Sequence, residues 1–174
     1  MTSRADFTDE EWTSLGRAPL VAALAISLSD PGGPIEAVKE SGAALRTVLE
    51  AAREGSFGEF VQSVANDVAA KAQRRENPLA GFALDRSRAR DEILDELRHV
   101  HALLVEKAAP EDVDDFREWM RIASQRAALA AKEGGFLGIG GKRVSEREQE
   151  MLETIGEIFG VPRGSSSSRR STEG

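Results

Sequence analysis

The chain has 174 residues, and its 30 acidic and 23 basic side chains give a formal charge of −7 at pH 7. It contains no cysteine, which excludes disulfides, thiolate metal sites and a cysteine nucleophile. The acidic balance argues against a nucleic-acid binder, because phosphate contacts need a positively charged surface. A chain of this length can bury about two-thirds of its unfolded surface, which is enough for one domain with a full core.

The first residues carry no signal for export or membrane insertion. Residues 1–7 lack the basic region and the apolar run of a signal peptide. The most apolar stretch covers residues 19–28, well short of the roughly 20 residues that a membrane-spanning helix needs. We expect this stretch to be a buried core helix in a cytoplasmic protein, with a helix lying on a membrane surface as the alternative.

The first helix is predicted to begin at Thr8. Thr8 and Glu11 have the spacing of a capping box, in which each side chain accepts a hydrogen bond from the other residue's backbone amide. Phe7 and Trp12 have the spacing of a hydrophobic staple across the same helix start. Pro19 has no amide hydrogen to donate, so a kink or a restart of the helix is expected there. The Asp-Pro-Gly-Gly-Pro run at 30–34 ends it.

Helical periodicity continues through the rest of the chain. Further helices are predicted at about 35–53, 57–74 and 88–107, from Pro110 to the glycine-rich segment, and from the capping box of Ser145 and Glu148 to about 159. Residues 163–174 are serine-rich and nearly free of apolar side chains, so they are expected to be disordered. The sequence therefore predicts an all-α fold, a single compact bundle of about six helices over residues 6–162.

No catalytic constellation can be assembled from these residues. A phosphate-binding loop needs a glycine where Phe136 stands and a hydroxyl group where Arg143 stands. The two histidines, His99 and His101, point to different faces of a helix, so they cannot bind one metal ion together. No serine, histidine and aspartate form a triad. We therefore expect the protein not to be an enzyme.

The glycine-rich segment at 134–143 holds the most unusual side chains of the chain. Phe136, Leu137 and Ile139 are large and apolar, and Lys142 and Arg143 follow directly. One interpretation is that the three apolar side chains close an end of the helical core. The other is that they form an exposed contact for a protein partner or for a lipid surface, with the two cations beside them.

Two stretches of the chain share one order of features. Residues 24–30 are an apolar helix followed by the acidic turn at Asp30, and the next helix opens with glutamate at Glu36. Residues 128–133 are an apolar helix followed by the glycine-rich segment, and the next helix has Glu148 in its first turn. This arrangement resembles the TerB-like family, the helical fold of the tellurite resistance protein TerB. The resemblance covers about the final 35 residues most closely.

The resemblance implies a bundle made of two helical halves in pseudo-repeat and a bacterial stress-response protein that acts by association. It places Asp30 and Glu36 on the first acidic turn and helix start, and Glu133 and Glu148 on the second. Such carboxylates would bind Ca²⁺ or Mg²⁺, and their alternative role is to cap helix N-termini. The prediction is a non-enzymatic interaction module with a protein partner. The alternative is a peripheral membrane protein that uses the 134–143 segment on lipid.

Overall fold

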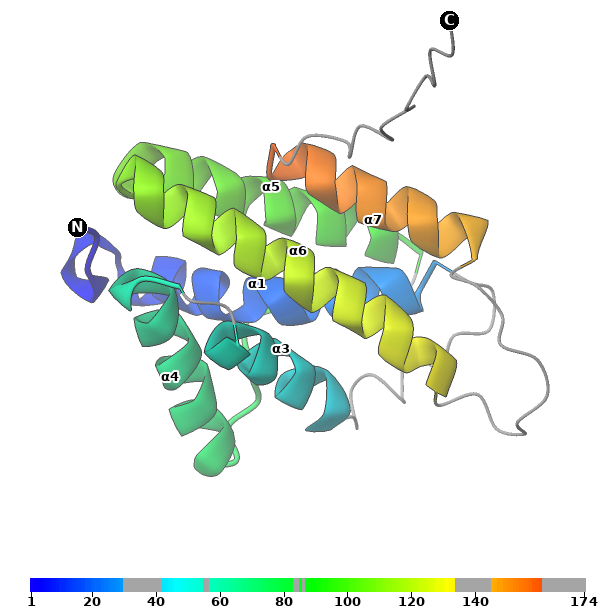
Figure 1. The fold of residues 1–174 in the computed structure, drawn as a ribbon, viewed down its shortest axis with the longest axis horizontal. Coiled ribbons are helices and arrows are strands. Elements are labelled where there is room, and N and C mark those ends of the chain that lie inside the picture. Colours follow the sequence, from blue (N-terminus) through cyan, green and yellow to red (C-terminus); the bar gives the residue numbers. More distant parts are fainter. Residues whose placement is uncertain (30–41, 55–56, 83–84, 86, 134–144, 161–174) are drawn as a thin grey trace, which may run out of the picture.

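The computed structural model describes residues 1–29, 42–54, 57–82, 85, 87–133 and 145–160. This part of the chain folds into one short 3₁₀ helix and six α-helices, without a strand, which confirms the all-α prediction (Figure 1). In chain order the elements are η1 (Arg4–Asp6), α1 (Asp9–Ser27), α3 (Gly42–Glu54), α4 (Glu59–Gln73), α5 (Ala89–Lys107), α6 (Pro110–Glu133) and α7 (Glu146–Ile158). The tail at 163–174 lies outside the described residues.

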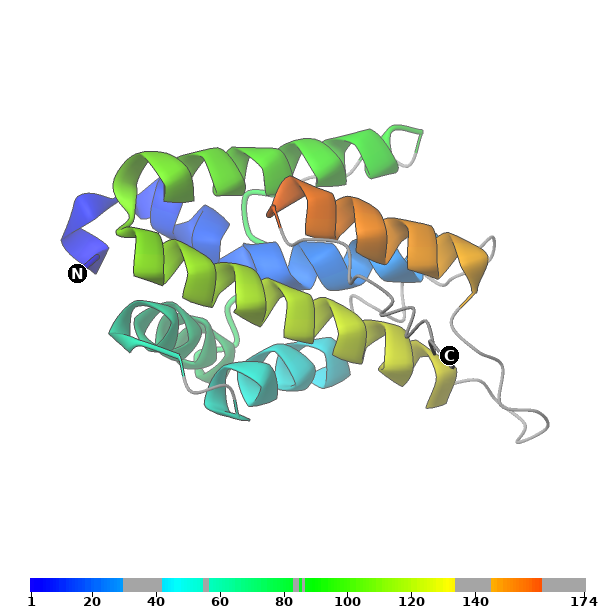
Figure 2. The same ribbon diagram turned by 45° about the horizontal axis from the view of Figure 1, so that its top comes forward.

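Helix α1 is the centre of the bundle. It contacts α3, α4, α5, α6 and α7, and Figure 2 shows it running lengthwise between α5 and α6. Because it is covered on all sides, almost every residue from Leu15 to Ile26 is buried. The apolar stretch at 19–28 is therefore a core helix, as predicted. Among the helices described, none combines the length and the apolar character that crossing a bilayer requires.

The restart expected at Pro19 does not occur. α1 continues as one helix from Asp9 to Ser27 with Pro19 inside it. An interior proline removes one backbone hydrogen bond and costs about 3 kcal/mol in an isolated helix. Here Pro19 and its neighbours on both sides are buried. Tertiary packing around this turn therefore keeps the helix continuous where the local sequence favours an interruption.

Both predicted capping boxes are present. The Thr8 amide donates to the Glu11 carboxylate at 2.8 Å, and the Glu11 amide donates to the Thr8 hydroxyl at 3.2 Å. The predicted staple is also present, with the ring centroids of Phe7 and Trp12 5.9 Å apart. Phe60 of α4 lies 5.8 Å from Phe7, so the start of α1 is tied directly to the aromatic core.

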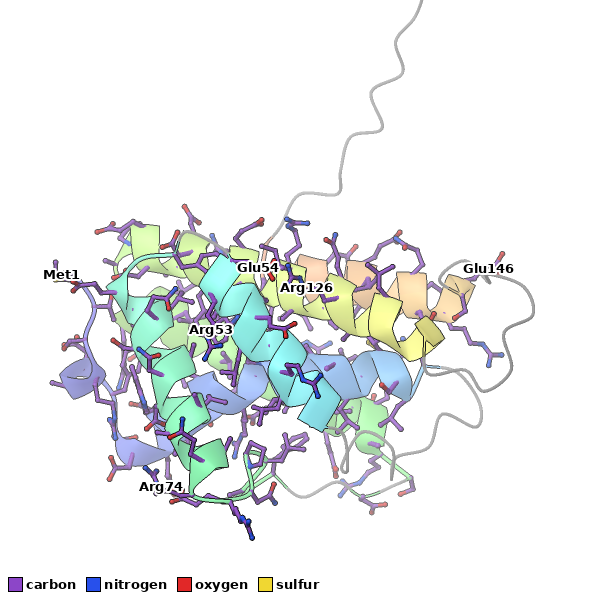
Figure 3. All side chains as sticks on the ribbon, turned by 60° about the horizontal axis from the view of Figure 1, so that its bottom comes forward. Met1, Arg53, Glu54, Arg74, Arg126 and Glu146 are labelled. Atoms are coloured by element: carbon purple, nitrogen blue, oxygen red, sulfur yellow. The ribbon has the colours of Figure 1, made fainter. Side chains whose placement is uncertain are left out.

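Helix α6 holds α3 and α4 in place through specific polar contacts. The Trp119 indole, which is fully buried, donates to the Val48 carbonyl of α3 at 3.1 Å. The Gly58 amide, at the start of α4, donates to the Asp115 carboxylate at 2.7 Å. Arg126 of α6 pairs with Glu54 at the end of α3, and Figure 3 shows the two side chains meeting.

Four helix ends meet at one end of the bundle. The C-terminal ends of α1 and α6 and the N-terminal ends of α5 and α7 lie together at the right-hand side of Figures 1 and 2. We call this the loop end, because the chain leaves α1 and α6 there and returns there to begin α7. The two connections that carry the predicted site, 30–41 and 134–144, lie outside the described residues.

Candidate functional site

A small pocket opens at the loop end, with a volume of about 70 Å³. Its lining comes from three helices that are distant in sequence: Ala25, Leu28 and Ser29 at the end of α1, Arg90 and Ile93 at the start of α5, and Met151 in α7. The helix packing, rather than any single motif, therefore creates this pocket.

The loop-end pocket is apolar with one cation at its rim. Ile93 is fully buried and Met151 is 3% exposed. The Ser29 hydroxyl donates to the Ala25 carbonyl at 3.0 Å, so its one hydrogen-bond donor is already used within the chain. Arg90 is exposed and is the one charged residue of the lining. The pocket suits an apolar group whose surroundings are neutral or negatively charged.

Of the four predicted metal ligands, only Glu148 has a described side chain. It is 8% exposed, and its carboxylate accepts a hydrogen bond from the Ser145 amide at 2.8 Å. In return the Glu148 amide donates to the Ser145 hydroxyl at 3.1 Å. Glu148 thus performs the capping role that the sequence left open as the alternative to metal binding.

The other predicted ligands are not placed relative to Glu148. Asp30 and Glu36 lie outside the described residues, and Glu133 is the last residue of α6 with a side chain that is not described. Among the side chains that are described, no three histidines, aspartates or glutamates come together as a metal site. The metal site remains a prediction. The structure does place Ser29, which precedes Asp30, just after α1, and Glu148 in α7, and these are two of the three helices that line the loop-end pocket.

The predicted partner contact also lies beyond the described residues. Phe136, Leu137, Ile139, Lys142 and Arg143 all belong to the connection at 134–144. The structure therefore tests neither interpretation of these residues, neither the closing of one end of the core nor the exposed contact. The flanking residues are described: α6 ends at Glu133, and Ser145 caps α7.

The two histidines lie on different faces of α5, as predicted. His99 is exposed, whereas His101 is half-buried with its ring against Phe159, 5.6 Å between centroids. The Nε2 atom of His101 lies 3.2 Å from Nη2 of Arg117. Because a guanidinium only donates, Nε2 accepts and the proton of the neutral ring is on Nδ1. Burial, and then the charge of Arg117, lower the pKa of His101 below its usual value.

A second pocket, between α6 and α7, was not predicted from the sequence. It has a volume of about 50 Å³ and is lined by Arg121, Ser124, Gln125, Leu152, Ile155 and Gly156. We call it the seam pocket. One sequence signal does point to it: a glycine inside a helical pattern costs about 1 kcal/mol relative to alanine, and Gly156 interrupts the pattern of α7.

Comparison of the chain with protein-family models, with curated protein sequences and with solved structures found no match.

Proposed function

We propose that this chain is a non-enzymatic interaction module of the TerB-like stress-response type that binds a protein partner at its loop end. Ca²⁺ or Mg²⁺, bound by Asp30 and Glu36 in the first connection and by Glu133 and Glu148 on either side of the second, would assist that binding. The observation that supports the proposal best is the meeting of the α1, α6 and α7 ends beside one apolar pocket. Both connections that carry the candidate residues are attached at this end.

Rigid attachments favour such a role for the connections. Binding residues are commonly carried by loops that a rigid scaffold positions. The first connection follows α1, which is packed on all sides in the centre of the bundle. The second connection precedes α7, whose first turn is fixed by a complete capping box. The apolar floor of Ile93 and Met151 suits a single buried side chain of a partner, the usual centre of a protein interface.

The metal part of the proposal is tested by thermal unfolding. A ligand that binds only the folded state raises the melting temperature, so millimolar Ca²⁺ or Mg²⁺ should raise it. The double variant Asp30→Asn, Glu148→Gln should lose this rise. Glutamine at 148 still serves in a capping box, so the helix start is kept while the charge is removed. An unchanged melting temperature at millimolar metal, against a matched concentration of NaCl, would show that these acids bind no metal.

The partner part is tested by site-specific photo-crosslinking in cells. A photoreactive residue at Ser29 should capture one protein repeatedly, and the same residue at the exposed Ala102, about 20 Å along α5 from its start, should not. The captured protein is then purified and its affinity measured against wild type and Arg90→Glu. Equal capture at both positions, or equal affinity for both chains, would count against a binding surface at the loop end.

A lipid surface is the second candidate, and Arg90 favours it. Its exposed side chain adds a cation at the loop end, where the connection carrying Lys142 and Arg143 is also attached. An apolar side chain such as Phe136 together with these three cations would suit an anionic membrane. Flotation with vesicles rich in phosphatidylserine should then depend on Phe136 and Arg90, and a failure to float would eliminate this candidate.

A further inference from the structure

The loop-end pocket has a small apolar floor. Ala25, Ile93 and Met151 form this floor, and each of them is at most 3% exposed. The volume of the pocket is about 70 Å³. A dry apolar cavity of about 150 Å³ accepts a benzene molecule, so by proportion this pocket fits about three carbon atoms, such as an isopropyl group. It is too small for an aromatic ring or for the acyl chain of a lipid.

Arg90 is the one charged residue of the pocket lining, and no described carboxylate neutralises it. Arg90 and Ile93 are three positions apart on α5, so they share a helix face and the arginine side chain starts beside the apolar floor. Arg90 is exposed, and it forms neither a hydrogen bond nor an ion pair with any of the described residues. Its guanidinium is therefore available to an anion that enters the pocket.

The acidic residues around this cation are directed elsewhere. Glu92 pairs with Arg88 at 3.3 Å. Asp91 is the next residue after Arg90 and therefore points about 100° away around the helix. Glu148 caps the first turn of its own helix, α7. None of these three carboxylates belongs to the pocket lining, so the lining combines an apolar floor with one uncompensated positive charge.

We propose that the loop-end pocket binds a short branched aliphatic carboxylate, with its alkyl group on the floor of Ile93 and Met151 and its carboxylate on Arg90. The alkyl group leaves water, and the two carboxylate oxygens match the parallel N–H groups of a guanidinium. A single cation suits a singly charged anion better than a phosphate. The same chemistry occurs in a free short-chain acid and at the C-terminus of a polypeptide that ends in valine. In the second case the inference rests on the proposed function, because the carboxylate then belongs to the bound partner.

Titration of the ¹⁵N-labelled chain at constant ionic strength tests the pocket with small probes. Sodium isobutyrate should shift the amide signals of residues 25–29, 90–94 and 150–152, and the shifts should saturate. Isobutyramide and isopropylammonium chloride carry the same alkyl group and should bind about fivefold more weakly or less, the effect of one solvent-screened ion pair. Arg90→Gln should lower the affinity for isobutyrate to that for isobutyramide. Arg98→Gln, which removes an exposed cation about 12 Å farther along α5, is the matched control and should leave the affinity unchanged.

Shifts that do not saturate, equal affinities for the three probes, or an unchanged affinity in Arg90→Gln would overturn the carboxylate site. The peptide acetyl-Gly-Gly-Gly-Val, with a free or an amidated C-terminus, distinguishes the two sources. If only the free form binds at the same residues, the ligand is a polypeptide C-terminus. If isobutyrate binds and neither peptide does, the ligand is a free acid. The probe titration needs no partner, and the metal and cross-linking tests need no carboxylate ligand, so this inference and the proposed function fail separately.

Discussion

The same substitution should have opposite effects at two helical glycines. Gly16 of α1 faces α4, and a Cβ atom added there lies 3.0 Å from Cγ2 of Val68. At Gly156 of α7 the added atom meets nothing within 4 Å. Replacing glycine with alanine in a helix interior gains about 1 kcal/mol of stability at either position. Only at Gly16 is this gain opposed by overpacking.

The size of the difference follows from the neighbour of Gly16. Val68 is 4% exposed and β-branched, and a helical valine keeps essentially one rotamer, so its methyl group cannot turn aside. Extra methyl groups in a packed core cost about 1–3 kcal/mol. We therefore expect Gly16→Ala to lower the free energy of unfolding by about 1 kcal/mol. Gly156→Ala should raise it by about 0.5–1 kcal/mol.

Urea unfolding measures both variants, with the midpoints compared at a constant slope. Val68→Ala supplies the control, because it removes the methyl group that Gly16→Ala would strike. The double variant should be more stable than the sum of the two single changes predicts. If Gly16→Ala stabilises as much as Gly156→Ala does, or if the double variant is simply additive, the close approach of α1 and α4 is not what limits position 16.

Three other changes test the polar and buried groups. Arg17→Met removes the partner that lies 2.6 Å from the Glu96 carboxylate, whose side chain is only 13% exposed. In urea unfolding the free energy of unfolding should fall by about 3 kcal/mol, and adding Glu96→Leu should recover part of this loss. If the effects of the two changes simply add, the two side chains are not coupled. Trp119→Phe removes the hydrogen bond to the Val48 carbonyl and should lower the free energy of unfolding by about 2 kcal/mol in the same assay. A decrease below about 0.5 kcal/mol would show that this hydrogen bond and the packing of the indole contribute little. His101 has a folded-state pKa below the usual 6.5, so the unfolded chain takes up the proton first and stability should fall as the pH drops below about 6.5. His101→Gln should lessen that fall between about pH 7.5 and 5.5, and identical slopes would refute the assignment.

Local signals in the sequence were sufficient to place the starts of α1 and α7. The capping boxes at Thr8 and Ser145 act within four residues, so their hydrogen bonds could be predicted without knowing the fold. Pro19 was different, because its local preference was overruled by side chains from other helices. The seam pocket could not be predicted either, since Ser124 and Gly156 meet only after α6 and α7 pack together.

The candidate site shows how one sequence pattern serves two purposes. A hydroxyl residue followed three positions later by glutamate is both a capping box and the acidic helix start of the TerB-like resemblance. The structure assigns the Glu148 carboxylate to the Ser145 amide, which the capping interpretation requires. Sequence alone could not show this bond, because a capping glutamate and a metal-binding glutamate have the same sequence pattern. The loop-end pocket likewise depends on three helices that only the tertiary fold brings together.

The central position of α1 has a consequence for biosynthesis. α1 leaves the ribosome before the five helices that cover it, and the last of these, α7, begins at Glu146. At ordinary elongation rates of about 5–20 residues per second, roughly ten seconds separate the two. Through that interval the nascent chain carries a helix that is apolar on every side over residues 18–26 and is only partly covered. Early docking of α3 and α4, or a chaperone that holds nascent chains, must protect it from aggregation until translation is complete.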